Sequence, residues 1–217
     1  MANYDNFPES TSCGSDGRYF SLVLGNYPGV VRYPIEMEIT PNDQKIKAYN
    51  ISYRRDYLNI VRLIVQTPTI RHAVLLFVDT MQSKAELWDP KDEMLPQNNE
   101  HVAQMLKLVD LLIPSGYTFD YTEAYFDTNF PLVCKNKVKG YCNAYILREA
   151  LDRINNRPSD TRSIKRFISA VEYHYKTRLE GQADNEYGPV GLGVGLLTGA
   201  LLGGALVGAA SHHRHRY

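Results

Sequence analysis

Cysteine is scarce in this sequence, and an odd number of cysteines excludes a framework in which every thiol is paired in a disulfide bond. The three cysteines are Cys13, Cys134 and Cys142. The first residues also lack the basic stretch and the apolar stretch of a secretory signal peptide. We therefore expect free thiols in a reducing compartment that faces the cytosol.

An excess of charge of either sign is also absent, because 24 basic residues (Lys and Arg) balance 24 acidic residues (Asp and Glu). The chain as a whole lacks the positive field that drives non-specific binding to phosphate backbones, so we expect no nucleic-acid partner. With 217 residues it is long enough for one domain with a buried core. We expect this domain to span residues 19–180, after a polar, mobile N-terminal arm of residues 1–18.

Apolar runs separated by turn residues predict several strands. Residues 20–24 and 30–33 are separated by glycine and proline, which predicts strands joined by tight turns. Residues 73–78 form a continuous apolar run and predict a buried strand, which a short turn connects to a second strand at 85–88. Residues 56–65 have mixed apolar spacing and fit either a short helix or a strand.

Helical spacing of apolar residues recurs in the second half of the chain. It predicts a helix over 98–113, which Pro114 and the residues after it end, a second helix over 143–155, and a third after Asp160. Residues 120–130 alternate aromatic and polar side chains and predict a further strand. The second helix places Cys142 at a helix N-terminus.

Cys142 is the candidate nucleophile, because the positive end of a helix dipole and a neighbouring imidazole both lower the pKa of a thiol. His72 precedes the apolar strand and Asp89 follows the next one, so the hairpin would place both at the same end. A carboxylate there can orient the imidazole. Taken singly, each residue also has an ordinary interpretation: a small buried thiol, a histidine at a strand start and an Asp-Pro turn.

The order of His72, Asp89, Asn136 and Cys142 resembles that of the ubiquitin-like (SUMO) proteases and the adenovirus-type proteases. The segments 71–79 (RHAVLLFVD) and 85–90 (AELWDP) are most similar to those of papain-like peptidases carried by large DNA viruses. The similarity covers residues 71–155, roughly the catalytic half of one domain.

This resemblance implies an α+β, papain-like domain in which a central helix packs on a mostly antiparallel sheet. It also implies that Cys142 attacks a peptide or isopeptide carbonyl, that His72 transfers the proton and that Asp89 orients His72. Asn136 and the backbone N–H of Cys142 would face the oxyanion. The implied partners are protein substrates or ubiquitin-like conjugates, and neither a cofactor nor a metal is expected.

The sequence departs from the family pattern at three positions. Asn136 stands where the family has Gln, Ala73 where a Trp commonly follows the histidine, and Asn143 where a small Gly commonly follows the cysteine. A catalytically inactive protein with the same fold therefore stays open as an alternative.

A glycine-rich segment close to the C-terminus predicts a membrane helix. Residues 188–210 contain no Asp, Glu, Lys or Arg, and this length can cross the core of a bilayer. Glycines recur at every fourth position from 191 to 203, a pattern that lets helices approach closely in lipid. The basic tail, residues 211–217, could meet anionic headgroups. A flexible Gly/Ala tail is the alternative, but it would expose many leucines.

Together these features predict a membrane-associated, cytosol-facing thiol peptidase-like protein of viral character, packaged in a virion. The alternative is an inactive structural virion or capsid protein that is anchored in a membrane by its glycine-rich helix and contacts neighbouring membrane or capsid proteins. A membrane-perturbing role of the segment is a third interpretation.

Truncation after Glu186 is expected to release the protein from membranes, because it removes the whole charge-free segment. Fractionation of cell extracts without detergent checks this expectation. Unchanged sedimentation of the truncated protein with membranes would exclude residues 188–210 as the anchor.

Overall fold

The structure is a computed structural model that describes residues 7, 17–40, 43–47, 51–68, 71–92, 99–126, 141–159 and 164–186. The chain divides into two units, residues 1–175 and 176–217, and the sheet lies in the first. The predicted membrane segment 188–210 and the basic tail lie outside the described residues. Within the described ranges, no helix has the length and apolar character needed to cross a membrane.

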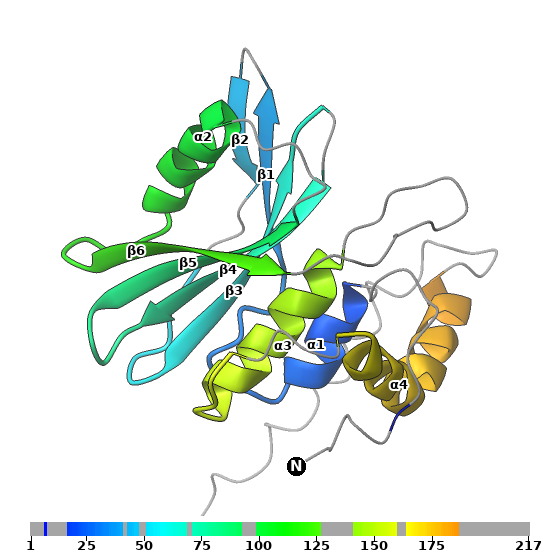
Figure 1. Ribbon diagram of the computed structural model, residues 1–217. Coiled ribbons are helices and arrows are strands. Elements are labelled where there is room, and N and C mark those ends of the chain that lie inside the picture. Colours follow the sequence, from blue (N-terminus) through cyan, green and yellow to red (C-terminus); the bar gives the residue numbers. More distant parts are fainter. Residues whose placement is uncertain are drawn as a thin grey trace, which may run out of the picture. The chain divides into compact units, whose positions relative to one another are not determined.

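Six strands form one mixed sheet in the described part of the chain, in the order β2-β1-β3-β4-β5-β6 (Figure 1). Their bounds are Ile35–Thr40 (β1), Asp43–Lys47 (β2), Leu58–Gln66 (β3), Arg71–Asp79 (β4), Lys84–Asp92 (β5) and Thr118–Phe126 (β6). The pairs β1–β2, β3–β4 and β4–β5 are antiparallel, whereas β1–β3 and β5–β6 are parallel. The predicted sheet was mostly antiparallel, and the observed one is mixed.

Four helices accompany this sheet in the described ranges: Arg18–Leu24 (α1), Asn99–Asp110 (α2), Cys142–Ile154 (α3) and Ile164–Glu186 (α4). Helix α2 packs against β1 and β2, and α3 packs against β3, β4 and β5. Helix α1 contacts α3 (Figure 1). Helix α2 also links β5 to β6, which lets these consecutive strands run parallel.

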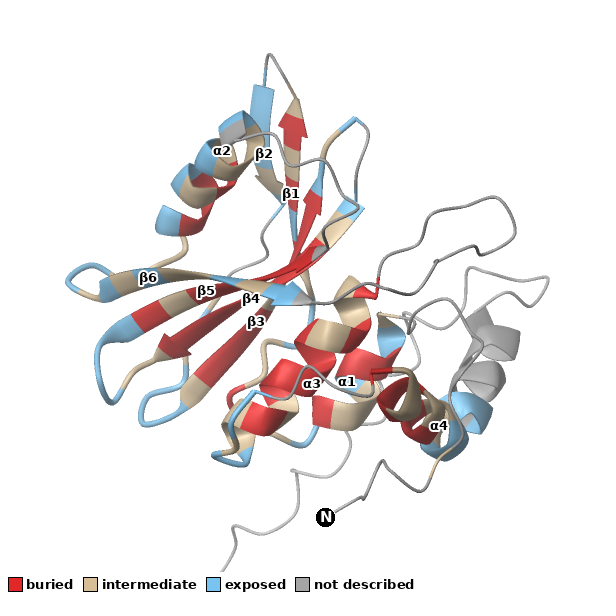
Figure 2. Cartoon of the chain, in the orientation of Figure 1, coloured by how far each residue is buried: buried red, intermediate tan, exposed pale blue. Residues whose placement is uncertain are grey.

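The alternation of side chains along β4 and β5 shows that α2 and α3 cover opposite faces of the sheet. Leu76 and Leu87 belong to one apolar cluster with Val109 of α2. Their neighbours along the strands, Phe77 and Glu86, point to the other face, where both contact Arg153 of α3. The central strands are therefore buried on both sides (Figure 2).

The β4–β5 hairpin forms where the sequence predicts it. In its turn, Oδ1 of Asp79 accepts the backbone N–H groups of Met81 and Gln82 at 2.9 and 3.1 Å. The left-handed backbone of Ser83 (φ 51°) then completes the reversal. Strand β5 consequently returns beside β4 with Leu76 opposite Leu87.

The predicted helices over 98–113 and 143–155 are confirmed by α2 and α3. The strand predicted over 120–130 is confirmed as far as Phe126, and residues 127–130 lie outside the described residues. Of the ambiguous residues 56–65, those from Leu58 onward belong to strand β3. The prediction of a strand over 20–24 is wrong, because these residues lie in α1. Phe20 and Leu24 are both buried, and a spacing of four residues fits the period of a strand as well as that of a helix. Residues 30–33 form only a single bridge, between Val30 and Ile60.

Leu76→Ala is expected to lower the free energy of unfolding by about 2–5 kcal/mol, since the side chain of Leu76 is fully buried between the sheet and α2. Leu111→Ala is the matched control, because Leu111 is 74% exposed and its truncation creates no cavity. Urea unfolding followed by circular dichroism measures both variants. Equal midpoints for the two would contradict the assignment of Leu76 to the core.

Candidate active site

The candidate site lies at the end of the sheet where β4 and β5 stop pairing. The antiparallel pairing of β4 with β5 ends at Leu75 and Trp88, although β5 continues beside β6 as far as Asp92. Beyond that pair, β4 stays paired with β3, but the side of its backbone that faces β5 can interact with groups that do not belong to the sheet. This separation of the two strands provides the place for the start of α3.

His72 and Asp89 meet across this separation. Nε2 of His72 lies 2.6 Å from Oδ1 of Asp89, and the side chains are 17% and 2% exposed. If the β4–β5 pairing continued one residue beyond Leu75 and Trp88, Asp89 would lie opposite Val74. His72 is two residues from Val74 on the same face of β4, so it lies diagonally across from Asp89. The prediction that the hairpin brings these two residues to one end is confirmed.

Cys142 is the first residue of α3 and joins this pair, as predicted from the helical spacing. Its thiol interacts with the side chain of His72 and with the backbone N–H groups of Ala73 and Asn143. Burial raises the pKa of the Cys142 thiol, but these interactions outweigh burial and hold the pKa below its ordinary value. The N-terminus of α3 favours the thiolate further.

The His72 ring uses its two nitrogens differently. Nε2 contacts Asp89, so Nδ1 is the nitrogen that is left for Cys142. Within the described residues, Nδ1 is buried and has no hydrogen bond of normal geometry, which indicates a loosely aligned electrostatic interaction with the thiol. Burial lowers the pKa of His72, but Asp89 and Cys142 outweigh this effect and raise it to about 9.

The opposite shifts of the two pKa values favour a thiolate–imidazolium pair. The pKa of Cys142 is lowered and that of His72 is raised to about 9, so both charged forms coexist in a window of pH that ends near 9. Asp89 is also ionised there. Burial raises the pKa of Asp89, but His72 and Lys91 outweigh burial and lower it.

Three further side chains surround Asp89, and sequence reasoning missed them. Lys91 and Tyr121 lie 2.8 Å from Oδ2 of Asp89, and Glu123 contacts both of them. Alternation could have placed Lys91 on the same face of β5 as Asp89. The positions of Tyr121 and Glu123 require the register of β6, which no local pattern gives.

Helix α3 is fixed to the sheet by Arg153. Its guanidinium donates two hydrogen bonds of 2.9 Å to Glu86 of β5 and one of 2.7 Å to Glu149. It also lies over the ring of Phe77, 5.1 Å from the centroid. Bidentate pairing of this kind restrains both the rotation and the axial position of the helix, and therefore the position of Cys142 at its other end.

Of the two predicted oxyanion donors, the backbone N–H of Cys142 belongs to the described residues. Asn136 lies outside them, as do Cys13 and Cys134. The backbone N–H of Cys142 lies in the first turn of α3, where the helix offers it no acceptor. It is therefore able to donate to an external oxygen.

A separate pocket of about 570 Å³ lies near the start of β3, whereas His72 pairs with Val65 near the end of that strand. Its lining includes Tyr33, Arg32 and Arg54, and none of His72, Asp89 and Cys142. The pocket is therefore distinct from the candidate site. No group of three or more His, Cys, Asp or Glu side chains suited to a metal occurs in the described ranges.

Comparison with known proteins gives similarity to solved structures. No protein-family model matches the sequence, and no curated protein matches it. The chain is similar to a structure of the SUMO protease Ulp1 with its catalytic cysteine oxidised to a sulfenic acid, with 14% identity, 55% of this chain covered and a TM-score of 0.34. It is also similar to the C-terminal Ulp1 protease domain in complex with Smt3, the yeast ortholog of SUMO, with 15% identity, 51% covered and a TM-score of 0.30. The chain spans about half of the length of these structures, 53% and 50%.

Asp89→Asn is expected to lower the pKa of His72 from about 9 by about one unit or more, because it removes the anion that stabilises the imidazolium. Histidine side-chain NMR signals followed over pH measure this pKa, with the His72 signal assigned by its loss in His72→Gln. Asp120→Asn is the matched control, since Asp120 pairs with Lys84 and is 58% exposed. An unchanged pKa of His72 in Asp89→Asn would contradict the observed pairing.

Proposed function

We propose that this protein is a cysteine peptidase of the ubiquitin-like protease kind, with Cys142 as nucleophile, His72 as acid–base and Asp89 as the group that orients His72. The observation that carries the proposal is the convergence of the three residues at one end of the sheet. The 2.6 Å contact between His72 and Asp89 and the coupling of His72 to Cys142 supply the two interactions that a thiol peptidase requires.

The reaction follows from the charges of the site. The Cys142 thiolate attacks the carbonyl carbon of a peptide or isopeptide bond, and the carbonyl oxygen becomes an oxyanion. The His72 imidazolium then gives its proton to the leaving amine, which breaks the C–N bond and leaves a thioester. Neutral His72 next takes a proton from water, whose oxygen attacks the thioester carbon. The C–S bond breaks, the acyl group leaves as a carboxylic acid, and the thiolate–imidazolium pair is restored. Asp89 keeps Nε2 protonated, so that Nδ1 carries the exchanged proton.

The oxyanion is stabilised by the backbone N–H of Cys142 and, in this proposal, by the side-chain amide of Asn136. A donor of this kind typically lowers the activation barrier by about 3–4 kcal/mol. Asn136 is one methylene shorter than the Gln of the family pattern, so its reach depends on the backbone before α3.

The substrate class, the cellular site and the source belong to the same proposal. The sequence resemblance supports a protein or ubiquitin-like conjugate as substrate, and it alone supports a viral origin and a virion location. The charge-free segment 188–210 supports attachment to a membrane.

An active site of this kind predicts that Cys142 reacts with iodoacetamide much faster than Cys13 and Cys134. Trypsin separates the three thiols onto different peptides, residues 1–18, 108–135 and 140–148, so mass spectrometry can follow each rate. His72→Ala is expected to remove the difference, because it removes the imidazolium that stabilises the thiolate. Equal rates for the three thiols in the unmodified protein would favour the non-catalytic alternative.

Hydrolysis of a ubiquitin-like C-terminal amide tests the reaction itself. Activity is expected to rise with pH as Cys142 loses its proton, and to fall near pH 9 as His72 loses its proton. Cys142→Ala should abolish activity, and His72→Ala should lower it by a factor of about 10²–10⁴. A reactive Cys142 without hydrolysis of any such amide would leave the thiol chemistry intact and exclude this substrate class.

A further inference from the structure

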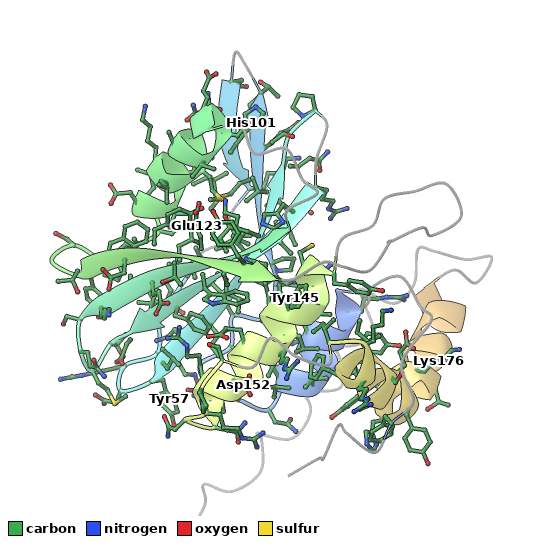
Figure 3. The ribbon with its side chains drawn as sticks, in the orientation of Figure 1. Tyr57, His101, Glu123, Tyr145, Asp152 and Lys176 are labelled. Carbon is green, nitrogen blue, oxygen red and sulfur yellow. The ribbon has the colours of Figure 1, made fainter. Side chains whose placement is uncertain are left out.

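The carboxylate of Asp89, a member of the candidate triad, lies directly opposite a second carboxylate on the neighbouring strand. In the parallel register of β5 and β6, Asp89 is the partner of Glu123 (Figure 3 labels Glu123 on β6). Like charges at opposite positions of neighbouring strands repel and destabilise the sheet. This pair therefore needs a positive charge close to both carboxylates.

Lys91 provides this charge from within the protein. Its side chain is 3% exposed, and Nζ lies 2.8 Å from Oδ2 of Asp89 and 3.3 Å from Oε1 of Glu123. A buried lysine is rare, because an ammonium group loses its hydration unless carboxylates replace it. Nζ also lies 5.7 Å from the ring centroid of Tyr121.

The hydroxyl of Tyr121 completes the surroundings of Asp89. It lies 2.8 Å from Oδ2 of Asp89 and 3.0 Å from Oε1 of Glu123. Burial and the negative charge of Asp89 raise the pKa of Tyr121 well above its ordinary value, so the hydroxyl stays a donor. Oδ2 is thus engaged by Lys91 and Tyr121, which leaves Oδ1 for Nε2 of His72.

We infer that Lys91 is a positioning residue and an internal counter-charge of the active site: it orients the Asp89 carboxylate toward His72 and balances the charges of the site when Cys142 is a thiolate. With Lys91 present, two cations, His72 and Lys91, face the buried anions Cys142 and Asp89 and the partly exposed carboxylate Glu123. Without Lys91, the same state would carry one more unbalanced negative charge in a poorly hydrated place, where ionisation is costly. This inference rests on the proposed function, and it concerns a residue outside the proposed triad.

The charged and titratable groups linked to Lys91 determine whether its removal raises or lowers the pKa of Cys142. Lys91 contacts Asp89 of β5 and Glu123 and Tyr121 of β6. Asp89 in turn contacts His72 of β4, which interacts with Cys142 of α3. Tyr125 donates to the other oxygen of Glu123 at 2.8 Å. Removing the cation raises the pKa of every acid in this set, whereas removing the Glu123 charge lowers them.

The test measures the rate of alkylation of Cys142 by iodoacetamide over pH in the full-length protein. Lys91→Met, which keeps an unbranched apolar chain, is expected to move the midpoint of this profile to higher pH by about one unit or more. Lys84→Met is the matched control, because Lys84 lies on the same strand and pairs with Asp120 at the surface. It should leave the midpoint unchanged.

Glu123→Gln is a second variant, for which the midpoint is expected to shift in the opposite direction. Its result does not depend on whether Lys91→Met folds. Glu123 is 34% exposed, so its substitution leaves the buried part of the network in place. The midpoint is expected to move to lower pH, by about half a unit. A folded Lys91→Met protein with an unchanged midpoint, or a Glu123→Gln protein with an unchanged or raised midpoint, would overturn the role of Lys91.

The same profiles separate this inference from the proposed function. If Cys142 titrates as an ordinary thiol in the unmodified protein and His72→Ala changes nothing, the proposed function fails. If Cys142 is acidic and depends on His72, but neither Lys91→Met nor Glu123→Gln moves the midpoint, only the inference about Lys91 fails.

Discussion

The hydrogen bond between Nε2 of His72 and Oδ1 of Asp89 is the interaction on which the candidate site depends. It joins β4 to β5 in the region where their backbone pairing has ended, so a contact between side chains replaces the ladder. The backbone N–H of Ala73 can then interact with the thiol of Cys142. One local departure from regular pairing thus both holds the imidazole and admits the helix that carries the nucleophile.

Burial disfavours the charged form of each group in the site, and the neighbouring charges determine the direction in which its pKa shifts. For Cys142, His72 and Asp89, burial is the largest single influence on the pKa and favours the neutral form. The opposite charge next to each group nevertheless outweighs burial and shifts its pKa toward the charged form. The chain of alternating charges continues through Lys91 to Glu123, where partial exposure lets water complete the solvation.

The sequence predicted the parts of the site that depend on local patterns. The hairpin and the helix beginning at Cys142 follow from apolar spacing over short stretches, and their ends place His72, Asp89 and Cys142. The same reasoning failed for α1, because the spacing of Phe20 and Leu24 suits two periods. It also missed Lys91 and Glu123, because their relation depends on pairing between β5 and β6, which are separated by α2.

Helix α2 therefore influences which residues surround Asp89, although it packs against β1 and β2 and contributes no side chain to the triad. It connects β5 to β6, and Val109 of this helix packs in the same cluster as Leu87 of β5. A slip of one residue in this parallel register would turn Tyr121 and Glu123 to the opposite face of the sheet. Asp89 would then lose its hydroxyl donor and Lys91 its second carboxylate. The crossover through α2 thus determines which charges surround Asp89.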